Sequence, residues 1–181
     1  MAKLRKGCCY RRPERPYTRK SKRREKSFVR GVPFSKIVSF DMGDKAKAQE
    51  YPCIIHFISK DTAQVRHNAL ESARIAVNKI LTTKIGNNGY YFKIKTYPHH
   101  VLRENALAAG AGADRFSTGM AHSFGKPTGI AAQIKEGQEV MYITTTPKYA
   151  EIAKEAMHQA RYKLSLRANI FIENREPKTK L

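Results

Sequence analysis

The apolar and polar positions of this chain follow regular periods from Gly31 to about residue 173. Runs of β-branched and aromatic residues are typical of strands, and apolar residues three to four positions apart are typical of helices. Strands are therefore expected at residues 36–42, 51–59, 90–97, 128–135, 139–146 and 167–173. Helices are expected from residue 61 or 62 to about 84, and from 146 to about 162. The short link at 136–138 suits a hairpin between the two strands that it joins.

Each expected helix has one face suited to burial. Asp61 or Thr62 can cap the first helix, and Thr146 can cap the second with Pro147 in its first turn. The expected buried stripes are Val65, Ala69, Ala73, Ala76, Val77 and Ile80 in the first helix, and Tyr149, Ile152, Ala153, Ala156, Met157 and Ala160 in the second. The residues expected largely on the other side of the first helix are Arg66, His67, Glu71, Arg74 and Asn78. His56 lies inside an apolar strand and is interpreted as a core histidine with satisfied hydrogen bonds.

Two strand–helix–strand units emerge, at residues 51–97 and 139–173, without a repeated sequence. The simplest architecture is an α+β fold, in which a mixed or antiparallel sheet carries both helices on one face. Residues 31–173 are expected to form a single domain, which is long enough to bury a core. Residues 174–181 are expected to be a flexible tail.

The stretch from Pro98 to Pro127 shows no sustained strand or helix pattern and contains four glycines. Connections longer than about 12–15 residues in a compact domain are usually functional or disordered. The small residues at 108–113 allow a close approach of the backbone to a partner, and the basic and aromatic residues that follow can bind phosphates and bases. We interpret this stretch as a protruding functional loop. The alternatives are a disordered surface loop and a short helix at 103–109 that ends in a glycine break.

The net charge narrows the choice of partner. The chain has 35 Lys and Arg against 15 Asp and Glu, a formal charge of +20, and its first 30 residues hold thirteen of these cations with only two Glu. A charge run can be a solvated tail or a localisation signal, but this density, with aromatic rings between the cations, favours nucleic-acid binding. Residues 1–30 are therefore expected to be a basic extension that is ordered only on its partner. Its candidate contact residues are Lys3, Arg5, Lys6, Arg11, Arg12, Arg15, Tyr17, Arg19, Lys20, Lys22, Arg23, Arg24 and Arg30.

Other classes of function find little support. No apolar run is long enough to cross a bilayer and the N-terminus lacks the apolar core of a secretory signal, so a soluble intracellular protein without a membrane partner is expected. Cys8, Cys9 and Cys53 form no disulfide framework, and the adjacent pair lacks the spacing of a zinc clamp. His99 and His100 have no carboxylate cluster near them in the sequence. Neither an enzyme nor a bound metal or cofactor is expected.

Several motifs resemble one protein family. They are CYR…PYTRKS, FVRGVP and KI…FDMG in the first part of the chain, LE.AR.A.NK at residues 70–79, AGADR at 111–115, TGM at 118–120 and FGKP at 124–127. Together, at this spacing, they are similar to the L-ten-e family of archaeal and eukaryotic large-subunit ribosomal proteins, the counterpart of bacterial L-sixteen. The resemblance covers nearly the whole chain and thins toward its C-terminus.

The resemblance implies an α+β structural constituent of the large ribosomal subunit, which binds large-subunit rRNA and neighbouring proteins near the cleft for tRNA. It implies that the loop at 102–116 extends toward the peptidyl-transferase centre and the acceptor end of tRNA. In eukaryotic members this loop also helps to test that site late in subunit maturation. The residues carried over to the tRNA-proximal surface are Arg103, Ala108, Gly110, Gly112, Ala113, Asp114, Arg115, Met120 and Lys126. The remaining alternatives are a stand-alone RNA-binding or chromatin protein and an RNA-modifying enzyme.

Overall fold

The computed structural model describes residues 5–18, 23, 29–105, 110–112 and 125–175. The helices are α1 (Cys8–Arg11), α2 (His67–Lys84) and α3 (Ala150–Arg161), with 3-10 turns η2 (Ala46–Gln49) and η5 (Pro147–Tyr149). The strands are β1 (Asp41–Gly43), β2 (Cys53–Ser59), β3 (Ala63–Arg66), β4 (Tyr90–Ile94), β5 (His100–Glu104), β6 (Lys126–Ile134), β7 (Glu139–Thr145) and β8 (Ala168–Asn174). None of the described helices is long and apolar enough to cross a membrane.

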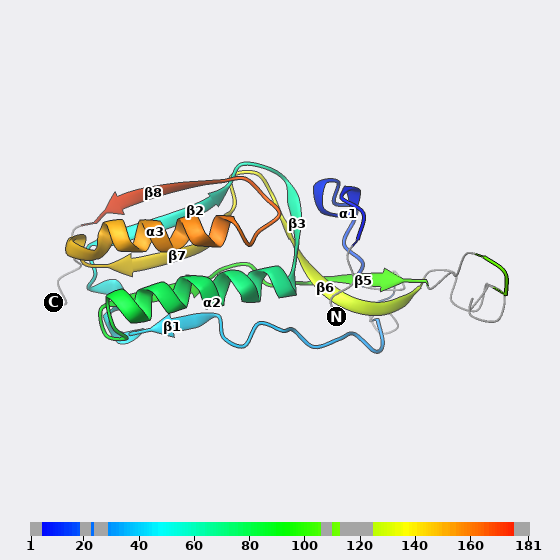
Figure 1. Ribbon diagram of the computed structural model, residues 1–181, viewed down its shortest axis with the longest axis horizontal. Coiled ribbons are helices and arrows are strands. Elements are labelled where there is room, and N and C mark those ends of the chain that lie inside the picture. The colour runs from blue at the N-terminus through cyan, green and yellow to red at the C-terminus, as the bar shows by residue number, and fades with distance from the viewer. Residues whose placement is uncertain (1–4, 19–22, 24–28, 106–109, 113–124, 176–181) are drawn as a thin grey trace.

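The main body is a five-stranded sheet in the order β1-β4-β7-β2-β8, in which every neighbouring pair is antiparallel. Because β2 and β4 both flank β7, the unit β2-α2-β4 is interleaved with the unit β7-α3-β8, as in split β-α-β folds. Helices α2 and α3 lie side by side on one face of this sheet (Figure 1). The α+β fold expected from the sequence is confirmed.

A second sheet, of three strands in the order β3-β6-β5, extends from one end of the main body (Figure 1). The expected hairpin between residues 128–135 and 139–146 is wrong, because β6 belongs to this small sheet and β7 to the large one. The turn between them is held by the end of β2 instead. The Gly137 N–H donates to the Ser59 carbonyl at 2.9 Å, and the Ser59 N–H donates to the Gln138 carbonyl at 3.0 Å. Strand β6 therefore joins the two sheets.

The start of the first expected helix is also wrong. Residues 63–66 form strand β3, which pairs with β6 from Ala63↔Ile134 to Arg66↔Ala131, and α2 begins only at His67. Asp61 is not a cap but forms an ion pair with Arg167. The tertiary pairing overrides the local helical period, and it leaves four buried or half-buried side chains in a strand. The strand expected at 36–42 is likewise reduced to β1.

The core lies between the two helices and the large sheet. From α2 it takes Leu70, Ala73, Val77 and Leu81, and from α3 it takes Ala153, Ala156, Met157 and Ala160. Ile80 and Ile152, expected in the buried stripes, are only half-buried. His67, expected on the exposed side, is 4% exposed, because α2 begins there and packs against β6. Its burial lowers its pKa, with further lowering by Lys36 and Arg66.

Gly43 closes β1 with a φ of +83°, and a Cβ atom built on it would lie 2.2 Å from the backbone oxygen of Tyr90. Gly43→Ala is therefore expected to lower the free energy of unfolding both by left-handed strain, about 1–2 kcal/mol, and by this clash with backbone. Gly137→Ala is the matched control, because Gly137 has a φ of +74° and nothing within 4 Å of the added atom. Denaturant unfolding of both variants measures the difference, and equal losses would contradict the importance of close packing at Gly43.

Candidate nucleic-acid interface

Strands β5 and β6 form a two-stranded ribbon that projects from the body (Figure 1). The pairing runs from His100↔Ala131 to Glu104↔Lys126, so both ends of the expected loop are strand. The alternative of a helix at 103–109 is wrong for its first two residues, which lie in β5, and residues 106–109 lie outside the described part. Gly125 supports the pairing at the distal end: a Cβ there would lie 2.8 Å from the Glu104 carbonyl carbon. The connection that remains is therefore 105–125, between the paired ends of β5 and β6.

Residues 5–18, which we call the docked arm, lie against the small sheet. The backbone N–H of Val101 donates to the Tyr17 carbonyl at 3.1 Å, and the N–H of Tyr17 donates to Nδ1 of His100 at 2.7 Å. The Nε2 amides of Gln133 and Gln64 donate to the carbonyls of Glu14 and Cys9, at 2.8 and 3.0 Å. The expectation that the arm is ordered only on its partner is wrong for residues 5–18, because strand β5 and these two amides satisfy its backbone groups.

His100 is suited to hold the arm because its imidazole is neutral and its Nδ1 can accept a hydrogen bond. Burial lowers the pKa of His100, and the nearby Arg103 and Arg5 lower it further, with Glu14 opposing them. A neutral imidazole keeps one ring nitrogen as an acceptor, which is what the Tyr17 N–H requires.

Two arginines lock the arm to the ribbon. Arg5 donates from Nη1 to the Arg103 carbonyl at 3.0 Å and from Nη2 to Oγ1 of Thr128 at 2.7 Å. The guanidinium of Arg103 lies 3.7 Å from the centroid of the Tyr17 ring, in cation–π contact. Arg5, Tyr17 and Arg103 were all predicted to contact RNA; the structure brings them together and engages each within the protein. Their first role is to position the arm.

The cations that the docked arm presents to solvent are Lys6, Arg11, Arg12 and Arg15. Further along the chain, Arg23 and Arg30 are exposed, as are Gly110, Gly112 and Lys126 of the predicted tRNA-proximal surface. The remaining predicted residues, Lys3, Arg19, Lys20, Lys22, Arg24, Ala108, Ala113, Asp114, Arg115 and Met120, lie outside the described part. The structure thus gathers one set of exposed cations on the arm and places the ribbon beside it.

Sequence reasoning missed the residues that hold the arm: Gln64, Gln133 and His100. Gln64 is 3% exposed and Oε1 of Gln64 also accepts from Gln133 Nε2 at 3.2 Å, so the two amides form one small network. A signal was present for Gln133, because a glutamine inside an expected apolar strand needs a hydrogen-bond partner once buried. The sequence alone does not name that partner.

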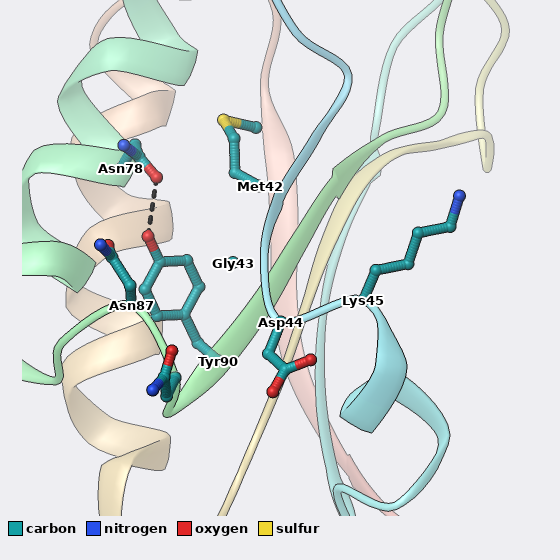
Figure 2. Close-up of a pocket in the computed structure, with 8 residues that line it drawn as sticks. Met42, Gly43, Asp44, Lys45, Asn78, Asn87 and Tyr90 are labelled. Carbon is teal, nitrogen blue, oxygen red and sulfur yellow. Dashed lines mark hydrogen bonds between the residues drawn. The ribbon is translucent and has the colours of Figure 1, made fainter.

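A depression of about 540 Å³ lies near the C-terminal end of α2 and is lined by Met42, Gly43, Asp44, Lys45, Asn78, Asn87, Asn88 and Tyr90 (Figure 2). The Tyr90 hydroxyl donates to Oδ1 of Asn78 at 2.8 Å, and Oδ1 of Asp44 accepts from the Ala46 N–H at 3.0 Å. Figure 2 shows the Lys45 side chain directed away from Asn78 and Tyr90. These polar groups are used in holding turns together, and their arrangement lacks a nucleophile with its base.

Among the described residues, no group of three or more His, Cys, Asp or Glu side chains is placed to hold a metal ion. Within the same part of the chain Cys8 is exposed, Cys9 half-buried and Cys53 buried, all as free thiols. Burial raises the pKa of the Cys53 thiol, which keeps it protonated and inert. An α+β body with a basic arm fixed beside a projecting ribbon has the features of the structural RNA-binding class of proteins.

Comparison with known proteins gives the family. The chain matches Ribosomal protein L16p/L10e over residues 13–171 and belongs to this family of ribosomal structural proteins, which confirms the resemblance found in the sequence. A protein of Methanococcus aeolicus named large ribosomal subunit protein uL16 is 46% identical over 170 residues, which cover 93% of this chain and 94% of that protein. Proteins of the same name from Methanoculleus marisnigri and Archaeoglobus fulgidus are 43% identical over 169 residues and 41% identical over 164. Those alignments cover 92% and 91% of this chain, and 98% and 90% of the relatives.

Proposed function

We propose that this chain is a non-enzymatic constituent of the large ribosomal subunit in the cytoplasm, and that it binds large-subunit rRNA through its docked arm and tRNA through the connection carried by its ribbon. Its partners are then rRNA, tRNA and neighbouring large-subunit proteins. The observation that carries the proposal is the docked arm, which holds Lys6, Arg11, Arg12 and Arg15 exposed on a segment fixed by hydrogen bonds to the small sheet.

Fixing the arm in advance favours binding. An unstructured basic tail loses conformational entropy when it settles on RNA, and this loss reduces the affinity. In the docked arm, backbone bonds at Tyr17, Glu14 and Cys9 already restrict the chain, while the four cations stay exposed. Arginine suits this task, because its planar guanidinium can donate two parallel hydrogen bonds to one phosphate. The rRNA therefore meets a set of cations that is already positioned.

The ribbon supports the second half of the proposal. Its last described pair, Glu104↔Lys126, holds the two ends of the connection together, and Gly110 and Gly112 are exposed with positive φ. Backbone without side chains can approach a sugar or phosphate closely. The exposed Lys126 adds a positive charge at the distal end of the ribbon. A fixed ribbon with a glycine-rich connection can contact a tRNA end that moves, while the body stays on rRNA.

Deleting residues 108–113 tests the tRNA role. The fold and the incorporation of the chain into large subunits are expected to persist, because the Glu104↔Lys126 pairing and the docked arm lie outside the deletion. Peptide-bond formation and tRNA footprints on subunits reconstituted with the shortened chain are expected to be impaired. Replacing the same residues by Gly-Ser repeats of equal length separates loop length from loop sequence. Normal rates together with normal footprints in the deletion variant would mean that 105–125 is only a connection.

A further inference from the structure

The face of the large sheet opposite the helices carries a row of side chains in register. Lys93 of β4 pairs with Tyr142 of β7, Tyr142 with His56 of β2, and His56 with Phe171 of β8. The adjacent row, Phe92, Ile143, Ile55 and Ile172, faces the core under α2 and α3. Because side chains alternate along a strand, the first row points away from the helices. We call Lys93, Tyr142, His56 and Phe171 the cross-strand row.

The row is aromatic in its middle and at one end, and cationic at the other. The rings of His56 and Phe171 are stacked with centroids 5.1 Å apart, and Phe171 is 45% exposed on the edge strand β8. The ammonium of Lys95, on the same side of β4, lies 5.2 Å from the centroid of the Tyr142 ring. The side chains of Lys93 and Lys95 are 38% and 49% exposed. Rings and ammonium groups therefore reach solvent on one surface.

The three carboxylates near the row are each paired with a cation. Glu139 contacts Nδ1 of His56 at 2.6 Å and also Lys95. Glu173 contacts Nε2 of His56 at 2.9 Å and Nε of Arg175 at 2.8 Å. The hydrogen bond from Arg175, and to a smaller extent the one from His56, lowers the pKa of Glu173. Asp41 accepts from the Tyr91 hydroxyl at 2.6 Å and lies 3.6 Å from Lys93. The acidic groups thus fix the rings and ammonium groups of this face in place, and their own charge is compensated.

We propose that the cross-strand row binds unpaired bases of single-stranded RNA, with bases stacked on Phe171 and Tyr142 and the connecting phosphates at Lys93 and Lys95. The proposal rests on RNA being the partner of this chain, as the proposed function has it. Four-stranded sheets of RNA-recognition-motif domains bind RNA in this way, through aromatic rings on an open face. The row offers one exposed ring, Phe171, and one half-buried ring, Tyr142, which lies beside the exposed Lys95.

The surface is less suited to a protein partner. The centre of a protein interface is apolar and depleted of charge. The cross-strand row and its neighbours instead carry charge along their whole length: Lys93, Lys95, Arg175, Glu139 and Glu173. With the chain's formal charge of +20, a polyanion is the better match.

The test compares Phe171→Leu and Tyr142→Leu, which keep an apolar side chain but remove the ring, with Tyr162→Leu. Tyr162 is 79% exposed and follows α3, away from the cross-strand row. Binding of the full-length proteins to a fluorescein-labelled oligouridylate of about ten nucleotides is measured over a range of salt. Each row variant is expected to weaken binding about 5- to 150-fold, which corresponds to the loss of one stacked base, without changing the log–log salt slope. Phe171→Tyr is expected to restore the affinity, and thermal melting confirms that the variants are folded.

Equal affinities of the Phe171→Leu and Tyr162→Leu proteins would overturn the inference. It would also be overturned if the row variants lost as much affinity for a blunt RNA duplex, which offers no free bases, as for the oligouridylate. An unchanged affinity together with loss of a neighbouring ribosomal protein from purified subunits would assign the row to a protein partner and overturn it as well. The proposed function is checked separately by co-sedimentation of the wild-type chain with the large subunit. The cross-strand row can therefore fail while the ribosomal assignment stands.

Discussion

Replacing Leu81 with alanine is expected to lower the free energy of unfolding by about 2–5 kcal/mol. Leu81 is 0% exposed and lies in the core between α2, α3 and the large sheet. The loss has two causes: burial of fewer methyl groups and the cavity that remains, which tightly packed neighbours fill only in part. Urea unfolding monitored by circular dichroism measures the change.

The matched control is Ile75→Ala in the same helix, where the side chain is 52% exposed. Its effect is expected to stay within about 0.5 kcal/mol, because much of the Ile75 side chain remains in contact with water in the folded protein. The half-buried Ile80 is expected to fall between the two. If Leu81→Ala and Ile75→Ala have the same effect, the core does not lie where the structure places it.

Neutralising the docked arm is expected to cause the largest change in RNA binding. Each Lys or Arg that neutralises a phosphate contributes about 0.7–0.9 to the log–log dependence of affinity on salt. Replacing the exposed Lys6, Arg11, Arg12 and Arg15 by glutamine is therefore expected to flatten the slope by about 3. Titrating binding to large-subunit rRNA fragments against salt measures this slope.

A second variant separates position from net charge. Replacing the exposed Lys79, Lys148, Arg161 and Lys163 by glutamine removes the same four charges from α2, η5 and α3, and from the residues just after α3. This helix-side variant is expected to keep a slope within about one unit of the wild type. Equal slopes in the two variants would show that only overall charge attracts RNA, with no preferred face.

Elements with strong local periods were predictable from the sequence. Strand β2 was expected at 51–59 and lies at Cys53–Ser59, and β8 was expected at 167–173 and lies at Ala168–Asn174. The satisfied hydrogen bonds expected of His56 are confirmed, because both ring nitrogens contact carboxylates, but its expected place in the core is wrong, because it lies on the sheet face opposite the helices. Apolar alternation is a local property, so it can be recognised from neighbouring residues in the sequence.

Features that depend on distant partners were not predictable. Strand β3 looks like the first turn of a helix until it pairs with β6, about 70 residues later. The hairpin at 136–138 was wrong because two strands that are close in sequence separate into two sheets. A period of two residues fixes which side a residue faces, but it does not select the neighbouring strand.

The docked arm shows the same limit for the functional site. Its charge made a polyanion partner predictable, but its order depends on Gln64, Gln133 and His100, which lie between about 55 and 120 residues away in the sequence. Composition alone favours disorder for such a segment. The exposed cations were therefore found, while their fixed positions were not.

Sedimentation of a tagged chain from cell lysate through a salt-containing gradient tests the central claim most directly. The wild-type chain and the helix-side variant are expected to migrate with the large ribosomal subunit, because the docked arm is intact in both. The variant with Lys6, Arg11, Arg12 and Arg15 replaced is expected to shift toward the free protein at the top of the gradient, increasingly so as the salt concentration rises. Wild-type chain found only at the top would contradict the ribosomal assignment, and an arm variant retained as well as the helix-side variant would contradict binding through the arm.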